Sequence, residues 1–297
     1  MSHMLNSKII IPKKNSIIAA IKMKTLFEIL PSSIDAENCT LVCELGTEGI
    51  SCAVKSEEKN SFVGMANYHF DISRPQVGFS IALQILFHQK EWLSQRFKKA
   101  SIFYSVAESV LIPFSLYDST KNNEVLNLIH GDLQNSSTVL ADVITEQEIY
   151  NVFRVPTAVY NAIQSQFPNI TSSHQYSALL KQKMSDKNKL SVIFYSQKMV
   201  VSLFKNGKFH LFNCFNYRTP EDVSYTLLNI CQQFETPDID LEISGLLEKD
   251  SGLFQEVYKY FTNITFASLS PDCIYSDAIL QYPPHYFSHI FALDTCE

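Results

Sequence analysis

The stretch LSVIFYSQKMVVSLFKNGKFHLFNCFNY, residues 190–217, decides the fold of this chain. It contains three runs rich in β-branched and aromatic residues, and short polar turns separate them. The second turn is Asn206-Gly207, a pair that tolerates the positive φ angles of a type I′ hairpin turn. The stretch therefore predicts three consecutive antiparallel strands.

A helix should follow these strands. Thr219 is a typical N-cap residue, Pro220 suits the first helical position, and Glu221 and Asp222 place negative charge in the first turn. Apolar residues recur at helical spacing until Pro237. Beyond that proline we expect a strand at IDLEIS, a helix after Gly245 and a strand at NITFAS, so the predicted order is β-β-β-α-β-α-β.

The first half of the chain repeats this order. It has three strands at LVCELG, ISCAVKS and SFVGMANYHF, a helix from Pro75, a strand at SIFYSV and a second helix over residues 124–129. Aligning Val42 with Val192 places Glu44 opposite Phe194. A pattern shared over about fifty residues indicates an internal duplication.

Three parts of the chain follow from this repeat. Residues 1–37 form an N-terminal extension, in which residues 1–3 look like a cloning remnant and residues 16–30 are expected to form a helix. Residues 38–172 form a first lobe (lobe I), and residues 173–297 form a second (lobe II). Each lobe is expected to be a mixed sheet with helices on its faces.

Composition narrows the class of protein. A chain of 297 residues with 46% hydrophobic and 18% charged residues can bury two cores. The net charge is −6 and no basic stripe is present, so no nucleic-acid partner is expected. No run approaches the roughly 18 apolar residues of a membrane span, and no secretory signal is recognisable. The seven cysteines form no C-x-x-C pair, which favours reduced thiols in a cytoplasmic protein.

Two tandem β-β-β-α-β-α-β units resemble the actin-like ATPase superfamily, whose units are ribonuclease-H-like. More closely, the chain is similar to an uncharacterised bacterial domain-of-unknown-function family with that fold. The resemblance covers residues 38–297. It implies an α/β protein with two tandem ribonuclease-H-like lobes, each with a mixed five-stranded sheet, and a cleft in which superfamily members bind ATP and Mg²⁺.

The resemblance implies three nucleotide-binding features, and the first is the best preserved. The superfamily pattern is Asp-Leu-Gly-Thr, whose acid positions a hydrated Mg²⁺ while the turn approaches the phosphates. Here the segment is Glu44-Leu45-Gly46-Thr47. Glutamate is one methylene longer than aspartate, and its carboxylate can still face a cation.

The other two features are degraded. The equivalent hairpin of lobe II should supply an acid and glycines, but Phe194 is aligned with the acid and the turn around Ser196 has no glycine. Without glycine the backbone cannot approach a triphosphate closely. A Gly-Gly pair after the fourth strand is reduced to Ser244-Gly245. The cofactor-binding candidates in the cleft are therefore Glu44, Gly46, Thr47, Ser196, Ser244 and Gly245.

These departures favour a non-catalytic role. We expect no catalytic residue, no bound ATP or Mg²⁺, and a pseudo-ATPase that acts by binding an unidentified protein partner. The alternative is a divergent ATP-binding phosphotransferase or ATPase that uses the cleft between the lobes, with Glu44 positioning the metal and Gly46 and Thr47 at the phosphates.

The sequence offers weak signals for two other kinds of site. His285 and His289 have the i, i+4 spacing of metal ligands, but no third ligand is suggested, so packed or surface histidines are favoured and no metal site is expected. A nuclease of the ribonuclease H type needs several carboxylates around two metals. Only Glu44 and Glu242 fall inside central strand positions, which argues against that activity.

Overall fold

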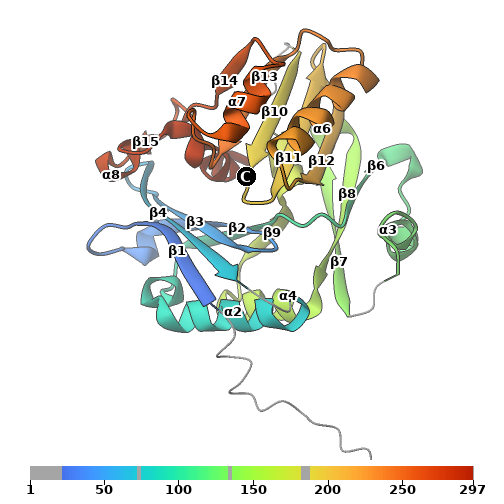
Figure 1. Ribbon diagram of the computed structural model, residues 1–297. Coiled ribbons are helices and arrows are strands. Elements are labelled where there is room, and N and C mark those ends of the chain that lie inside the picture. Colours follow the sequence, from blue (N-terminus) through green and yellow to red (C-terminus); the bar gives the residue numbers. More distant parts are fainter. Residues whose placement is uncertain (1–21, 72–74, 133–135, 182–187, 297) are drawn as a thin grey trace, which may run out of the picture.

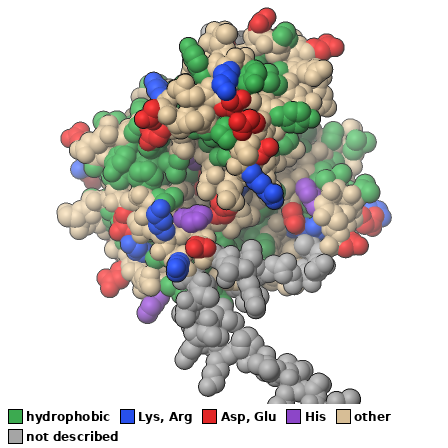
Figure 2. Space-filling view, in the orientation of Figure 1, with side chains coloured by type: hydrophobic (Ala, Val, Ile, Leu, Met, Phe, Trp, Pro, Cys, Tyr) green, Lys and Arg blue, Asp and Glu red, His purple; other side chains and the backbone are tan. Residues whose placement is uncertain are grey.

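The computed structural model describes residues 22–71, 75–132, 136–181 and 188–296 (Figure 1). In this part of the chain three β-sheets are present, one for each lobe and a smaller one inserted in lobe I. None of its helices is long and apolar enough to cross a membrane. On the face shown in Figure 2, acidic and basic side chains are interspersed.

The lobe I sheet has the order β1-β4-β3-β2-β5-β9, and β15 pairs with β4. Its strands are β1 (Lys22–Ile29), β2 (Cys39–Leu45), β3 (Gly49–Ser56), β4 (Ser61–Asp71), β5 (Lys99–Tyr104), β9 (Thr171–His174) and β15 (Ile274–Tyr275). The sheet is mixed, because β2–β5 and β5–β9 are parallel while β2, β3 and β4 form antiparallel hairpins. Helices α2 (Pro75–Gln89) and α4 (Thr157–Gln166) lie together across one face (Figure 1).

A three-stranded sheet is inserted between β5 and α4, which the sequence did not predict. Its order is β6 (Ser109–Pro113), β8 (Ile149–Pro156), β7 (Ser137–Ile144), all antiparallel. Helix α3 (Asn122–His130) is the helix expected over residues 124–129, and it packs on this sheet through Leu126. The position of the second lobe I helix is taken by α4.

The lobe II sheet agrees with the prediction. It has five strands in the order β12-β11-β10-β13-β14, and helices α6 (Pro220–Gln233) and α7 (Gly252–Tyr258) cover one face. The strands are β10 (Lys189–Phe194), β11 (Lys198–Lys205), β12 (Lys208–Asn216), β13 (Asp240–Gly245) and β14 (Ile264–Phe266). Asn206 and Gly207 have φ values of 55° and 70°, as a type I′ turn requires. Thr219 and Asp222 form the capping box at the start of α6.

The two lobes share one strand order, since β4-β3-β2-β5-β9 corresponds to β12-β11-β10-β13-β14. The predicted fold of two ribonuclease-H-like lobes is therefore confirmed. The register corrects our alignment by one residue, because Leu45 pairs with Ile50 where Phe194 pairs with Met199. Phe194 thus corresponds to Leu45, and both side chains point into the helix-covered core. A shift of one residue moves a side chain to the other face of a sheet.

The prediction of an N-terminal helix at residues 16–30 is wrong for the part of that range that the structure describes. Lys22–Ile29 is strand β1, which pairs antiparallel with β4; residues 1–21 lie outside the described part. Pairing with a long neighbouring strand overrides a weak local preference for helix. Phe27 of β1 also packs edge-on against Tyr282 and Phe287 near the C-terminus.

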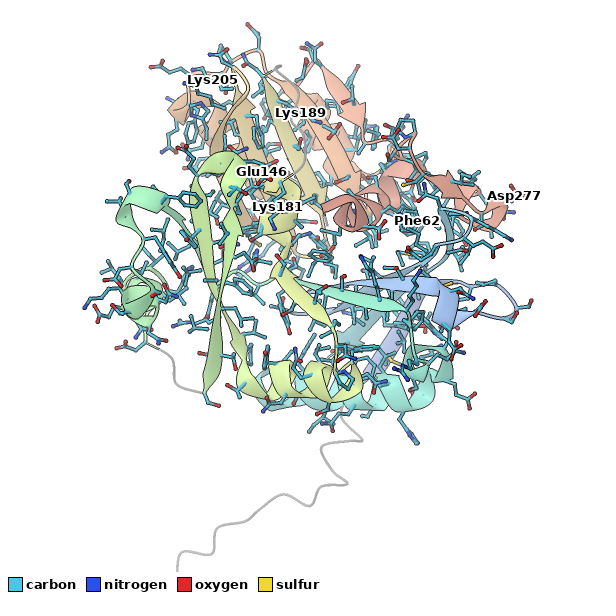
Figure 3. The ribbon with its side chains drawn as sticks, turned by 180° about the vertical axis from the view of Figure 1, so that it is seen from behind. Phe62, Glu146, Lys181, Lys189, Lys205 and Asp277 are labelled. Atoms are coloured by element: carbon cyan, nitrogen blue, oxygen red, sulfur yellow. The ribbon has the colours of Figure 1, made fainter. Side chains whose placement is uncertain are left out.

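The C-terminal segment returns from lobe II to lobe I. After β14 it forms β15, α8 (Asp277–Leu280) and α9 (Ser288–Phe291). Phe291 packs on Phe62 of β4, which Figure 3 shows beside this segment, and Lys55 forms an ion pair with Asp294 at 2.5 Å. The lobe boundaries expected from the sequence assign these elements to lobe II, and those boundaries stay a prediction. In the structure the segment packs on the lobe I sheet.

One further α-helix, α5 (Gln175–Lys181), and seven short 3₁₀ helices complete the described structure. Helix α5 links the lobes and packs on the inner face of the lobe II sheet through Tyr176 and Leu180. The 3₁₀ turns are η1 (Ala36–Asn38), η2 (Glu91–Ser94), η3 (Phe114–Leu116), η4 (Ser119–Lys121), η5 (Thr145–Gln147), η6 (Pro284–Tyr286) and η7 (Ala292–Cys296).

Candidate functional site

A cavity of about 210 Å³ lies between the first hairpin turns of the two lobes, residues 46–48 and 195–197. Five of the six residues predicted from the sequence line it: Glu44, Gly46, Thr47, Ser196 and Gly245. The sixth, Ser244, lines an adjoining cavity of about 340 Å³ on the inner face of the lobe II sheet. The structure therefore brings the predicted residues of both lobes to one place.

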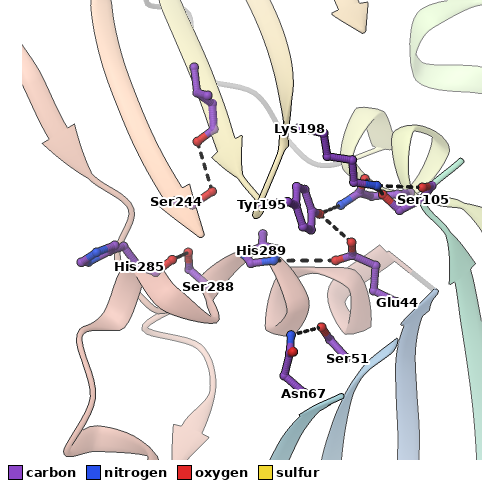
Figure 4. Close-up of polar contacts among 12 residues, drawn as sticks. Glu44, Ser51, Asn67, Ser105, Tyr195, Lys198, Ser244, His285, Ser288 and His289 are labelled. Atoms are coloured by element: carbon purple, nitrogen blue, oxygen red, sulfur yellow. Dashed lines mark hydrogen bonds and ion pairs between the residues drawn. The ribbon is translucent and has the colours of Figure 1, made fainter. Parts of the chain in front are cut away.

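Glu44 is the acid at the floor of this cavity. It sits near the end of β2 opposite Ser51 of β3, on the face away from α2, and only 3% of it is exposed. Its Oε1 atom accepts a hydrogen bond from the Tyr195 hydroxyl at 2.5 Å (Figure 4). Its Oε2 atom has no hydrogen-bond partner among the described residues, and His289 Nε2 of α9 is 3.7 Å away.

A chain of hydrogen bonds continues from Tyr195 across the interface (Figure 4). Gln175 Nε2 donates to the Tyr195 hydroxyl at 2.6 Å, and Ser105 Oγ donates to Gln175 Oε1 at 2.9 Å. Lys198 Nζ donates to Ser105 Oγ at 3.3 Å and to the Ser105 carbonyl at 3.1 Å. We call these five residues, Lys198, Ser105, Gln175, Tyr195 and Glu44, the cleft relay.

The chemistry of the side chains sets the direction of the relay. An ammonium group can only donate, so Ser105 Oγ accepts from Lys198 and its own proton goes to Gln175. The Gln175 amide then presents its NH₂ group to Tyr195, whose proton is left for Glu44. Every donor therefore points from the ammonium toward the carboxylate, and hydrogen bonds in such a chain polarise one another.

Burial sets the protonation behaviour of the site. It raises the pKa of Glu44, while the hydrogen bond from Tyr195 and the positive charge of Lys198 lower it. Burial also raises the pKa of Tyr195, and the neighbouring Glu44 adds to that increase. Burial lowers the pKa of His289 to about 3, so its imidazole is neutral at neutral pH.

No group of three or more acidic, histidine or cysteine side chains within the described ranges is arranged to hold a metal ion. The two C-terminal histidines do not converge. His285 Nε2 lies 2.9 Å from the Leu247 carbonyl, whereas His289 faces Glu44. At Glu44, the oxygen that accepts from Tyr195 is already occupied by a phenol from the opposite lobe.

Gly245, the glycine that remains of the expected Gly-Gly pair in lobe II, has a packing role. Gly245 has a φ of +87°, and a Cβ at this position would lie 2.1 Å from the Phe194 carbonyl oxygen. β13 runs parallel to β10 at this point, so only glycine allows the approach. The neighbouring Ser244 makes only a long contact, 3.5 Å, to the Val192 carbonyl.

Sequence reasoning missed four relay members, and it considered His289 only as a possible metal ligand or a packed or surface residue, without placing it beside Glu44. Ser105, Gln175 and Tyr195 are far apart in the sequence and belong to no recognisable motif. Lys198 did leave a signal, because it is a charged residue at the start of the apolar run MVVSLF. Such a residue should either reach solvent or find buried partners.

The fold and the cleft define a protein of the actin-like ATPase fold class. The chain belongs to the family described as "Protein of unknown function (DUF3822)", whose family model matches residues 31–264. The resemblance proposed from the sequence is thereby confirmed.

Two solved structures share the fold. A Bacteroides thetaiotaomicron protein with an actin-like ATPase fold and unknown function has a TM-score of 0.72 and 20% identity, and the match covers 90% of this chain and 100% of that one. A structure described as a PilM-PilN type IV pilus biogenesis complex has a TM-score of 0.59 and 9% identity, covering 86% and 97%. No curated protein matches the chain in sequence.

Proposed function

We propose that this protein is a non-catalytic member of the actin-like fold class, a pseudo-ATPase that acts by binding another protein. The observation that carries the proposal is the hydrogen bond from Tyr195 to Glu44. It fills, with a side chain of lobe II, the position from which the acid of lobe I would meet a hydrated cation.

The cost of displacing Tyr195 supports a non-catalytic cleft. A nucleotide with Mg²⁺ would have to break the bond to Glu44 and leave the buried Gln175 amide without its acceptor. Leaving a buried polar group unpaired costs about 1–3 kcal/mol. The turn at residues 195–197 also has no glycine, so its backbone is not free to wrap a phosphate.

Support for a protein partner comes from helix α3 on the inserted sheet. Leu128 and Ile129 are adjacent, and 83% and 61% of their surfaces are exposed. Large exposed aliphatic side chains next to one another are typical of interaction sites. One structural neighbour is a complex of two pilus proteins, and this likeness extends to the fold alone.

The competing function is a divergent ATP-binding phosphotransferase or ATPase. The observation in its favour is that Glu44, Gly46, Thr47, Ser196 and Gly245 line a single cavity. Under this alternative, Tyr195 would have to swing away from Glu44 when the nucleotide enters.

A thermal unfolding experiment separates the two. We expect no change in the melting temperature of the wild type with 1 mM Mg·ATP. A ligand at 100 times its Kd stabilises the folded protein by about 2.7 kcal/mol. Binding of Mg·ATP with a Kd near 10 μM would therefore raise the melting temperature measurably. A rise that Glu44→Ala abolishes would overturn the non-catalytic proposal and favour the phosphotransferase.

A further inference from the structure

Lys198 is a buried ammonium group without a neighbouring carboxylate. Only 9% of the residue is exposed, and no ion pair within 4.0 Å involves it among the described residues. Its Nζ atom contacts the Ser105 carbonyl and hydroxyl and lies 4.8 Å from the centre of the Tyr195 ring. An isolated charge is costly to bury, so the fold must compensate it.

The compensation comes from Glu44 at the other end of the cleft relay. Each relay bond points its donor away from Lys198, so the positive end of the chain is at the ammonium and the negative end at the carboxylate. The charge of Lys198 also acts directly on Glu44, whose pKa it lowers. The two charges therefore lie at opposite ends of a chain of three intervening side chains, and they make no direct contact.

The position of Lys198 in the fold explains how it reaches the cleft. In the hairpin of lobe I, Gly46 N–H donates to the Gly49 carbonyl, and in lobe II, Tyr195 N–H donates to the Lys198 carbonyl. Lys198 thus corresponds to Gly49, and Tyr195 to Gly46. The lysine points back across the cleft, and its Nζ lies 3.5 Å from where a Cβ on Gly46 would stand.

We propose that the cleft contains a site for a cation and that the ammonium group of Lys198 fills it permanently. The inference rests on the proposed non-catalytic function and gives it a physical basis. The relay joins Lys198 and Tyr195 of lobe II to Ser105 and Glu44 of lobe I, through Gln175 of the linking helix α5. The lobes are therefore held together without any bound ligand.

Chemical rescue tests the proposal. Lys198→Ala removes three methylenes and the ammonium, which is the shape of n-propylammonium. We expect 50 mM propylammonium chloride to raise the melting temperature of Lys198→Ala by about 2 °C, which is about the shift that one kcal/mol produces in a chain of this size. The same concentration of 1-propanol, which has the shape without the charge, should have no such effect.

Lys205→Ala is the matched control. Lys205 is on the same strand and its ammonium donates to the Phe234 carbonyl at 3.0 Å, but it lies at the far end of lobe II from the cleft (Figure 3). Propylammonium should not stabilise this variant. Equal rescue of both variants, equal rescue by propanol, or no rescue of Lys198→Ala would overturn the inference.

A second measurement covers the case in which Lys198→Ala does not fold. Lys198→Met keeps most of the side-chain volume, and Glu44→Gln removes the opposite charge. If the two charges compensate each other, the double variant should lose less melting temperature than the sum of the single variants, although the residues are not in contact. Additive losses would contradict the inference. A melting-temperature rise of the wild type with Mg·ATP would instead contradict the proposed function, so the two failures are distinguishable.

Discussion

Removal of one oxygen atom, in Tyr195→Phe, is the sharpest perturbation of the cleft. The ring stays in place, but Glu44 Oε1 loses its donor and Gln175 Nε2 loses its acceptor. Glu44 Oε2 already has no partner among the described residues, so the carboxyl group would be left without a hydrogen bond there. The change therefore tests whether the relay stabilises the protein.

The expected loss follows from the contacts. A hydrogen bond to a charged group contributes about 1.5–3 kcal/mol, and an unsatisfied buried amide costs about 1–3 kcal/mol. The two contributions come from the same hydroxyl group and are not fully additive. We therefore expect Tyr195→Phe to lose about 2–4 kcal/mol of unfolding free energy. The loss should be measured by urea denaturation, which reports stability as the midpoint multiplied by the slope.

The loss should also depend on pH. Burial raises the pKa of Glu44 above its unfolded value of 4.5, so its contribution to stability is fully present below that value and falls as pH rises through the folded pKa. Without the Tyr195 hydrogen bond the folded pKa rises further. The difference between wild type and Tyr195→Phe should therefore be larger at pH 8 than at pH 5.

Tyr217→Phe is the matched control for this prediction. The Tyr217 hydroxyl donates to the Tyr195 carbonyl at 2.6 Å, so its removal deletes a hydrogen bond to a neutral group in the same region. We expect a loss of about 1 kcal/mol that does not change between pH 5 and pH 8. A Tyr195→Phe variant that is as stable as Tyr217→Phe, with the same pH dependence, would refute the reasoning.

Three further predictions concern other parts of the structure. Burial lowers the pKa of His289 to about 3, so its contribution to stability is present above the unfolded value of 6.5 and is lost as pH falls toward 3. His289→Asn should therefore flatten the pH dependence of urea stability between pH 4 and pH 6.5, where His289 alone could supply about 3 kcal/mol. Gly245→Ala should lower stability by more than about 2 kcal/mol in the same assay, because φ is positive and a Cβ would meet the Phe194 carbonyl. Replacing Leu128 and Ile129 by Asp should change stability by less than about 0.5 kcal/mol per site, yet abolish co-purification of any partner held by wild type; retention of that partner would exclude α3 as the binding surface.

Local signals in the sequence were sufficient for the elements that depend on neighbouring residues. The Asn206-Gly207 turn and the Thr219 capping box are each complete within four residues, and both are present as predicted. Strand β1 was missed because its state depends on pairing with β4, about forty residues later. In the inserted sheet, β6 and β8 are likewise far apart in the sequence, but β7 and β8 form a hairpin with four residues between them, a local pattern that the sequence prediction overlooked.

The same distinction between local and long-range information applies to the site residues. Glu44, Gly46 and Thr47 were found because one short segment carries them. The register of the second hairpin was wrong by one residue because Val192, Ile193 and Phe194 are all apolar and buried, so no polar alternation shows which of them corresponds to Glu44. That shift hid the correspondence of Tyr195 with Gly46, and with it the side chain that contacts Glu44.

The corrected register changes what the loss of glycine means. Under the first alignment, lobe II simply lacked the acid and the flexible turn of lobe I. In the structure, the two positions that correspond to glycines of lobe I carry the phenol that donates to Glu44 and the ammonium at the other end of the cleft relay. A turn that had only degraded would leave the buried carboxyl of Glu44 without a donor, which is costly. Because the replacements supply both a hydrogen bond and a positive charge, Glu44 is explained as one end of an internal contact that joins the lobes.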